Sequence, residues 1–198
     1  MTGMLRTEAA AVLAAARGEL LSVVTMQALV PWKALGQADE RNFTVQGAMG
    51  SAAAIGLGLA LARPEERVLV IDGDGSLMMQ LASLVSIADL APANLVHAVF
   101  ENGVYETSGG QDVPGRTVAD LPDIAAASGY REVRRYASVD ELAADAPSAL
   151  RRPGPVFLSI EIDGPGAVAF PPGFRQPPAA PVQIENMRTA LRTGGAAR

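Results

Sequence analysis

Short apolar runs recur along this chain and alternate with longer segments rich in alanine and leucine. Near-continuous, β-branched runs are typical of strands that are covered on both faces in a parallel sheet. The pattern predicts strands at 20–25, 42–46, 68–71, 95–100, 132–136 and 155–162. It predicts helices at 1–17, 31–35, 51–63, 77–90, 121–128, 139–151 and 182–191. This alternation indicates an α/β fold, a doubly wound parallel sheet with helices on both faces.

The strand expected at 68–71 runs directly into a turn formed by Gly73, Asp74 and Gly75. Glycine allows the backbone to turn sharply and leaves the amides of such a turn uncovered. Serine is a residue type that caps helices, so we expect Ser76 to open the helix at 77–90. Because a helix N-terminus attracts anions, a diphosphate group would fit at this turn.

Asp74 and Asn102 follow two neighbouring strands of the predicted sheet, at 68–71 and 95–100. In a right-handed βαβ unit the carboxyl ends of such strands lie side by side, so a carboxylate and an amide oxygen should converge. Mg²⁺ prefers a few protein oxygens together with phosphate oxygens and water. A bare GDG can be no more than a tight turn, but the strand, helix, strand and Asn that follow it favour a cofactor site.

These segments resemble the thiamine diphosphate-binding motif, in which GDG and a downstream Asn hold Mg²⁺ and the diphosphate. Here GDGS begins at Gly73, and ENG places Asn102 28 positions after Asp74. NFTVQGAMGSAAAIGLGLAL, VIDGDGSLMM and ENGVYETSGGQ are similar to the β subunit of sulfopyruvate decarboxylase and to the C-terminal part of phosphonopyruvate decarboxylase. The resemblance covers about residues 20–162.

The resemblance implies thiamine diphosphate and Mg²⁺ as cofactors, and it assigns roles to individual residues. Asp74, Asn102 and the backbone carbonyl of Val104 would bind the metal. The implied cofactor-binding residues are Gln27, Gly47, Met49, Gly73, Asp74, Gly75, Ser76, Asn102, Val104, Tyr105 and Glu106, and the implied catalytic residues are Met49, Glu106 and Ser108.

Several of these assignments have an alternative. Gly47 would accept a hydrogen bond from the aminopyrimidine and Met49 would keep the cofactor bent, but methionine is also a common filler of core gaps. Gln27 can equally be a loop residue without a ligand. The loop at 105–111 resembles the family segment that closes over the diphosphate and substrate, and it can also be a plain surface loop.

Four further residues invite a functional reading that we do not favour. His97 is the only histidine, but it falls inside a predicted strand, which indicates a structural role. Trp32 is expected in the core or an interface. Lys33 and Arg41 are expected to be solvated surface charges rather than ligands of an anionic substrate.

Composition narrows the classes of function. The 198 residues carry a formal charge of −5, which gives no reason to expect nucleic-acid binding. The absence of cysteine excludes disulfides and thiolate metal sites. The longest apolar stretch, 52–62, is too short to span a bilayer, so we expect a cytoplasmic protein without a membrane partner. We expect a cofactor-binding domain at 1–162 and an extended Pro- and Gly-rich tail at 163–198.

The resemblance also implies a partner. In the family, a glutamate that faces the aminopyrimidine comes from a separate pyrimidine-binding domain, for which this chain has no room. An α subunit that supplies this Glu is therefore expected, in a hetero-oligomer that decarboxylates a small 2-keto acid with an anionic 3-substituent. The split arrangement resembles sulfopyruvate decarboxylase, whereas GGQ at 109–111 resembles phosphonopyruvate decarboxylase. A carboligase subunit and a non-catalytic scaffold or regulatory subunit stay open as alternatives.

Overall fold

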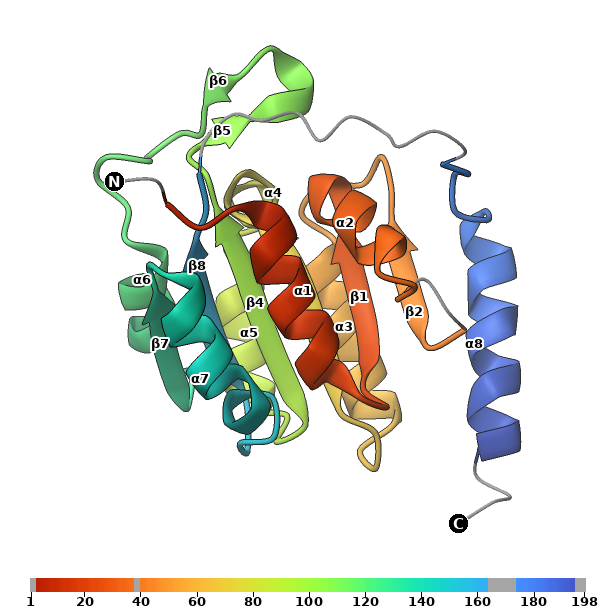
Figure 1. Ribbon diagram of the computed structural model, residues 1–198. Helices are drawn as coiled ribbons and strands as arrows, with labels where there is room; N and C mark the ends of the chain where they lie inside the picture. Colours follow the sequence, from red (N-terminus) through yellow and green to blue (C-terminus); the bar gives the residue numbers. More distant parts are fainter. Residues whose placement is uncertain (1–2, 38–39, 164–173, 195–198) are drawn as a thin grey trace.

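The computed structural model describes residues 3–37, 40–163 and 174–194. Its main sheet has six parallel strands in the order β2-β1-β3-β4-β8-β7 (Figure 1). The strands are β1 (Leu21–Thr25), β2 (Asn42–Val45), β3 (Val68–Gly73), β4 (Leu95–Glu101), β7 (Glu132–Tyr136) and β8 (Val156–Glu161). The predicted fold class is confirmed.

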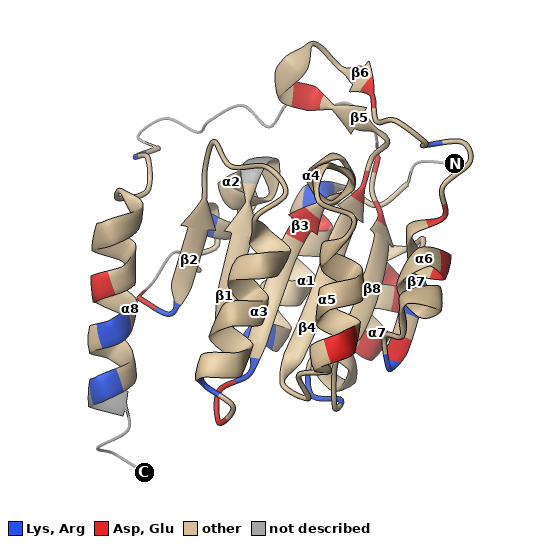
Figure 2. Ribbon diagram, turned by 180° about the vertical axis from the view of Figure 1, so that it is seen from behind, with Lys and Arg blue, Asp and Glu red and all other residues tan. Residues whose placement is uncertain are grey.

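Helices cover both faces of the sheet, because alternate residues of the central strands point to opposite sides. In β3, Leu69 and Ile71 pack with one core cluster, and Val68 and Val70 pack with the other. The helices on the first face are α1 (Arg6–Arg17), α2 (Leu29–Ala34) and α7 (Val139–Ala149) (Figure 1). Those on the second face are α3 (Ala52–Ala62), α4 (Asp74–Met79), α5 (Ser83–Leu90) and α6 (Leu121–Ser128) (Figure 2).

The strand order changes direction beside β1. The chain passes from β1 to β2 on one side and then returns to β3 on the other side of β1. In open parallel sheets, ligands bind at the carboxyl ends of the strands at such a switch point. A small antiparallel hairpin stands above this edge and consists of β5 (Val104–Tyr105), the 3-10 turn η2 (Glu106–Ser108) and β6 (Gln111–Asp112) (Figure 1).

The helix predicted at 77–90 is wrong in two respects. It begins at Asp74 with Gly73 as its N-cap, so Ser76 lies inside α4 and does not cap it. It also breaks after Met79 and resumes as α5 at Ser83. Gly50 lies against this break, where a Cβ would come 3.1 Å from the Cβ of Gln80. A tertiary contact therefore accompanies the interruption that local propensity did not indicate.

Two other helices begin earlier than predicted. α2 begins at Leu29 rather than Pro31, and the C-terminal helix α8 runs over Ala180–Gly194. α8 lies beside the edge strand β2, where the Gln183 side chain accepts a hydrogen bond from the Thr44 amide (2.6 Å) and donates one to the Thr44 carbonyl (3.2 Å). The helix predicted at 182–191 within the tail is therefore present, extends further at both ends, and covers a sheet edge. Two parts of the tail, 164–173 and 195–198, lie outside the described residues.

The core placement expected for Trp32 is confirmed. Its side chain is fully buried, and its ring nitrogen donates to the Asn42 Oδ1 at 3.1 Å. His97 is also fully buried within β4 and contacts the Phe157 ring edge-on, with 5.4 Å between the ring centroids. Among the described residues, no helix has both the length and the apolar character that crossing a membrane requires.

Candidate functional site

A small cavity of about 70 Å³, partly open to solvent, lies at the carboxyl ends of β1, β3 and β4. Figure 2 shows acidic residues at this end of β3, beneath the hairpin of β5 and β6. The lining residues are Arg6, Thr25, Gln27, Ala28, Met49, Asp72, Gly73, Asp74, Gly75, Ser76, Phe100, Asn102, Val104, Tyr105, Glu106, Thr107 and Ile162. The cavity therefore occupies the switch point of the sheet.

Most of the site residues predicted from sequence meet in this cavity. All three candidate metal ligands, Asp74, Asn102 and Val104, are among its lining residues. Two predicted residues are not: Gly47 is exposed in the loop after β2, and Ser108 is exposed at the end of η2. Lys33 and Arg41 lie outside the cavity as well. The expectation that both are solvated surface charges is wrong for Arg41, whose side chain is only 16% exposed and pairs with Glu66. Lys33 is half-buried and donates to the Arg175 carbonyl.

The Asp74 carboxylate joins the ends of β3 and β4. Its Oδ1 accepts from the Gly75 amide at 2.7 Å, and its Oδ2 accepts from the Gly103 amide at 2.6 Å. The Gly73 amide donates to the Asp72 Oδ1 at 2.9 Å. The expectation that the turn leaves its glycine amides uncovered is therefore wrong for Gly73 and Gly75, because neighbouring carboxylates accept from both.

Burial raises the pKa of Asp74 above its ordinary value of 3.8. Hydrogen bonds from the backbone amides of Gly103, Gly75 and Asn102 lower the pKa in part, and the nearby Glu106 raises it further. A carboxylate that is costly to ionise in a buried position is stabilised by any cation that binds beside it. Asp74 thus has the electrostatic setting of a metal ligand.

The amide of Asn102 is bonded at both ends. Its Oδ1 accepts from the Val104 amide at 3.0 Å, and its Nδ2 donates to the Glu106 Oε1 at 2.9 Å. Glu106 in turn forms an ion pair with Arg6, at the start of α1. Both side chains are almost fully buried, with 7% of Arg6 and 4% of Glu106 exposed.

The segment that carries Met49 is fixed to α4. The Gly50 amide donates to the Ser76 Oγ at 3.0 Å, which explains the position of this serine inside the helix. Met49 is half-buried and lines the cavity. The hydroxyl of Ser76 therefore holds the turn that positions Met49.

Tyr105 closes the cavity from the hairpin side. Its ring lies so close to Gly75 that a Cβ at that position would come 2.4 Å from the ring atom Cε1. Only glycine permits this approach. The turn after β3 and the hairpin after β4 are thus in direct contact.

Sequence reasoning missed Arg6 and Asp72 as lining residues. Asp72 is fully buried, and its Oδ2 lies 3.6 Å from the Nε2 of His97, whose Nδ1 is 3.2 Å from the Tyr130 hydroxyl. A carboxylate directly before GDG was a usable signal for Asp72. For Arg6 the only signal was a basic residue at the start of a helix, where the macrodipole disfavours it.

The donor chemistry of the cavity fits a hard cation and a polar cofactor. Among the described residues, the buried Oε1 of Gln27 and Oδ2 of Asp72 have no hydrogen-bond partner. The Asp72 oxygen faces the His97 Nε2 at 3.6 Å, whereas buried polar atoms normally have partners, so the Gln27 oxygen indicates a missing ligand or water. The described residues hold no cluster of three or more His, Asp or Glu that could bind a metal alone, which suits a mixed set of carboxylate, amide and carbonyl oxygens.

Known proteins resemble this chain in the same region. A family model described as thiamine pyrophosphate enzyme, C-terminal TPP binding domain, matches residues 24–160. Phosphonopyruvate decarboxylase of Streptomyces viridochromogenes is 43% identical over 154 residues, 78% of this chain and 37% of that protein. Sulfopyruvate decarboxylase subunit beta of Methanothermobacter thermautotrophicus is 40% identical over 131 residues, 66% of each chain.

A solved structure supports the fold. The thiamine diphosphate-dependent 4-hydroxybenzoylformate decarboxylase of Rhodococcus jostii RHA1 superposes with a TM-score of 0.65 at 20% identity. The superposition covers 82% of this chain and 33% of that one. The chain spans about a third of the length of the phosphonopyruvate decarboxylase and about two thirds of the sulfopyruvate decarboxylase subunit.

Proposed function

This chain belongs to the thiamine pyrophosphate enzymes, as their C-terminal TPP binding domain, and from that membership we propose that it holds thiamine diphosphate and Mg²⁺ in the cavity at the switch point. The observation that carries this proposal is the convergence of Asp74, Asn102 and Val104 in one cavity with Met49. The buried Gln27 oxygen, which has no hydrogen-bond partner among the described residues, supports it.

Each residue has a proposed task. Asp74, the Asn102 amide oxygen and the Val104 carbonyl hold Mg²⁺. Gly73, Gly75 and Ser76 form the wall beside the diphosphate, with Gln27 at the end of β1. Gly47 and Met49 orient the aminopyrimidine, and Tyr105 and Ser108 face the substrate side from the hairpin. Glu106, in the same hairpin, acts from within the site through Asn102.

When bound, thiamine diphosphate supplies a carbon nucleophile and an electron sink for the loss of CO₂ from a 2-keto acid. The protein residues contribute orientation, exclusion of water and charge balance. Tyr105 excludes water from the turn after β3, because its ring already contacts Gly75. Asp74 contributes a buried charge whose ionisation the cation favours, since burial raises its pKa.

The proposed reaction is decarboxylation of a 3-substituted pyruvate, either phosphonopyruvate or sulfopyruvate, to the aldehyde and CO₂. The names of the two relatives support this substrate class. The subunit naming of the second relative supports a partner chain. We propose that this partner is a pyrimidine-binding α subunit that supplies the glutamate, in a cytoplasmic hetero-oligomer.

The decisive test is calorimetric titration of thiamine diphosphate with Mg²⁺ into this chain, alone and mixed with the candidate α subunit. Binding is expected only in the mixture, and Asp74→Ala is expected to weaken it more than about 100-fold, since a first ligand of the metal is lost. Asp89→Ala is the matched control, because this exposed carboxylate in α5 lies outside the cavity. This variant should bind thiamine diphosphate with an affinity within about twofold of the wild-type value.

Release of CO₂ from phosphonopyruvate and sulfopyruvate then identifies the substrate. Binding without CO₂ release from either acid, but with transfer to an added aldehyde or keto acid, would instead establish a carboligase. Absence of binding in a mixture whose two chains associate would contradict the cofactor site itself.

A further inference from the structure

Arg6 occupies a position that a basic residue should avoid. It is the first residue of α1, where the positive end of the helix macrodipole repels a cation. Its side chain is nevertheless only 7% exposed and lines the cavity at the carboxyl edge. Glu8 fulfils the ordinary role of an acid in this first turn, because its carboxylate accepts from the Leu5 amide at 2.9 Å. The helix start therefore needs no arginine for its own stability.

The partner of Arg6 explains its position. Glu106 lies 100 residues further along the chain, in η2 of the hairpin, and its carboxylate is only 4% exposed. Asp72 and Asp74 line the same cavity, so Glu106 is one of three buried acidic side chains there. A buried carboxylate without a cation is strongly disfavoured. Arg6 supplies the charge that allows Glu106 to stay inside.

Glu106 uses this position to orient Asn102. The Glu106 Oε1 accepts from the Asn102 Nδ2, and the Val104 amide donates to the Asn102 Oδ1. A reversed amide would place its oxygen against a carboxylate and its NH₂ group against an N–H. Both contacts would be repulsive, so the network permits one orientation only. Glu106 thus determines the direction in which the Asn102 amide oxygen points.

We propose that Arg6 is a positioning residue for the metal site: through Glu106 it holds the Asn102 amide with its oxygen turned away from the carboxylate. That oxygen accepts from the Val104 amide and has a second lone pair with which to bind a cation. This inference rests on the proposed function, because it concerns the residues that support Asn102 as a ligand of the metal. Such supporting partners typically affect metal affinity by about 10- to 100-fold. The N-terminal turn of α1 thereby becomes part of the site.

A double-mutant cycle tests this relay, the action of Arg6 on Asn102 through Glu106. Mg²⁺ is titrated calorimetrically into the two-subunit mixture at saturating thiamine diphosphate, for Arg6→Met, Glu106→Gln and the double variant. Arg6→Met is expected to weaken Mg²⁺ binding about 10- to 100-fold. In the Glu106→Gln background the same change should cost less than about twofold, because a neutral amide oxygen in place of the carboxylate accepts from Asn102 without a cation.

Two further variants serve as controls. Arg6→Lys keeps the charge and should recover most of the affinity lost in Arg6→Met. Lys33→Met removes a cation of α2 that lies outside the cavity, and should leave the affinity within about twofold of the wild-type value. Equal losses from Arg6→Met in both backgrounds, or no loss in the wild-type background, would overturn the relay. Should Arg6→Met fail to fold, Glu106→Ala replaces it and must show the same loss of about 10- to 100-fold.

The orientation of Asn102 is read separately in the chain without cofactor or metal. In isotope-labelled protein, the side-chain NH₂ signals of Asn102 should exchange slowly with water and lie apart from those of exposed amides. Arg6→Met should return them to the exposed-amide region, and Arg6→Lys should not. Because this measurement needs no ligand, it can fail while the cofactor site stands, and it can succeed even where the cofactor proposal fails.

Discussion

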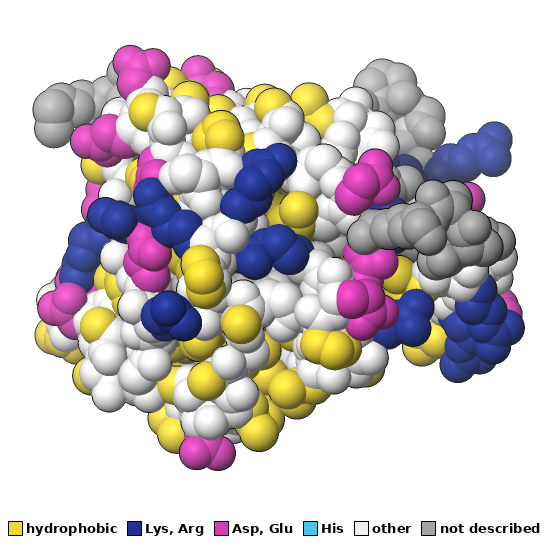
Figure 3. Space-filling view, turned by 90° about the horizontal axis from the view of Figure 1, so that it is seen from below, with side chains coloured by type: hydrophobic (Ala, Val, Ile, Leu, Met, Phe, Trp, Pro, Cys, Tyr) yellow, Lys and Arg dark blue, Asp and Glu magenta, His cyan; other side chains and the backbone are white. Residues whose placement is uncertain are grey.

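The two edges of the sheet place charged side chains in different settings. At the carboxyl edge, acidic side chains are buried around a cavity, and the Oε1 of Gln27, which lines it with them, has no hydrogen-bond partner among the described residues. At the amino edge, basic side chains gather on the surface seen in Figure 3. There, arginines close the loops by donating to backbone carbonyls, as Arg67 does to Leu150 (2.8 Å) and Arg17 to Leu20 (2.9 Å).

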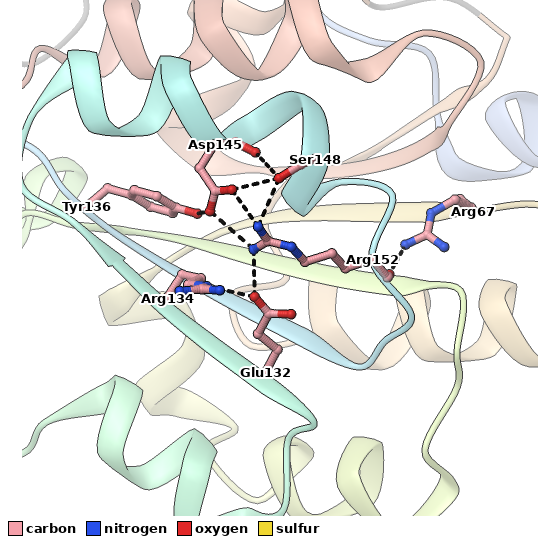
Figure 4. A network of polar contacts seen from close by, with 7 residues as sticks. All are labelled: Arg67, Glu132, Arg134, Tyr136, Asp145, Ser148 and Arg152. Carbon is pink, nitrogen blue, oxygen red and sulfur yellow. Dashed lines mark hydrogen bonds and ion pairs between the residues drawn. The ribbon is translucent and has the colours of Figure 1, made fainter.

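The network around Arg152 shows the amino edge at close range (Figure 4). Arg152 donates to Glu132 (2.6 Å) from β7 and to Asp145 (2.7 Å) from α7, and the Tyr136 hydroxyl donates to the same Asp145 (2.8 Å). Each carboxylate here has a cation or a hydroxyl beside it. Paired charges thus stabilise the fold at one edge, whereas a buried oxygen without a partner at the other edge is available to a ligand.

The largest effect is expected where the site is closed by a packing contact. Gly75→Ala would place a Cβ 2.4 Å from the Tyr105 ring, so the ring and its hairpin must move. We expect the free energy of unfolding to fall by about 1–3 kcal/mol, and amide hydrogen exchange over 104–112 to accelerate. Both are measured on the chain without ligand, by urea unfolding and by hydrogen exchange with mass spectrometry.

Gly58→Ala is the matched control for this substitution. Gly58 lies in α3, and a Cβ there would meet no atom within 4 Å. The change should stabilise the helix by about 0.5–1 kcal/mol and leave exchange of the hairpin unaltered. Unchanged exchange in Gly75→Ala would mean that the Tyr105 ring yields without cost, and that the contact does not close the site.

A smaller effect is expected at the amino edge. Arg152→Met keeps the apolar stem of the side chain but removes the ion pairs with Glu132 and Asp145. These groups are a quarter exposed, so solvent screens them, and we expect a loss of only about 1 kcal/mol in the free energy of unfolding. Binding of thiamine diphosphate should not change. A large loss of cofactor affinity would show that the two edges are coupled rather than independent.

The central part of the fold could be predicted from sequence because its signals are local. Apolar runs marked the central strands β1, β3, β4 and β8, and the alternation of segments placed the edge strands β2 and β7. GDG with a downstream Asn located the cavity. The break between α4 and α5 could not be predicted, since it accompanies a contact with Gly50 from another segment. The same holds for Gln183, whose pairing with Thr44 spans 139 residues.

The parts of the site that were missed also depend on distant contacts. Arg6 pairs in the cavity with Glu106, which no local pattern relates to it. Ser76 has the residue type of a helix cap, but its hydroxyl serves the Gly50 amide instead. Local chemistry therefore predicted which residues could act, and tertiary packing decided which of them meet.

The smallest expected effect is a difference in pH dependence between the two edges. Burial raises the pKa of Asp74 above 3.8, so its ionisation costs more in the folded chain than in the unfolded one. Burial likewise raises the pKa of Glu101 above 4.5. In the ligand-free chain, their contribution to stability is therefore lost as pH rises from these ordinary values through the raised folded values.

Asp145 should act in the opposite direction. Burial alone would raise its pKa, but hydrogen bonds from Ser148, Tyr136 and Arg152 outweigh burial and lower the pKa below 3.8. Its stabilising contribution is therefore complete above that value and is lost as pH falls through the lowered one. The free energy of unfolding is measured with urea from about pH 3 to about pH 7. Asp74→Asn should reduce the loss of stability as pH rises, and Asp145→Asn should reduce the loss of stability as pH falls. Equal effects of both variants on one side would contradict the division of the sheet into a paired edge and a binding edge.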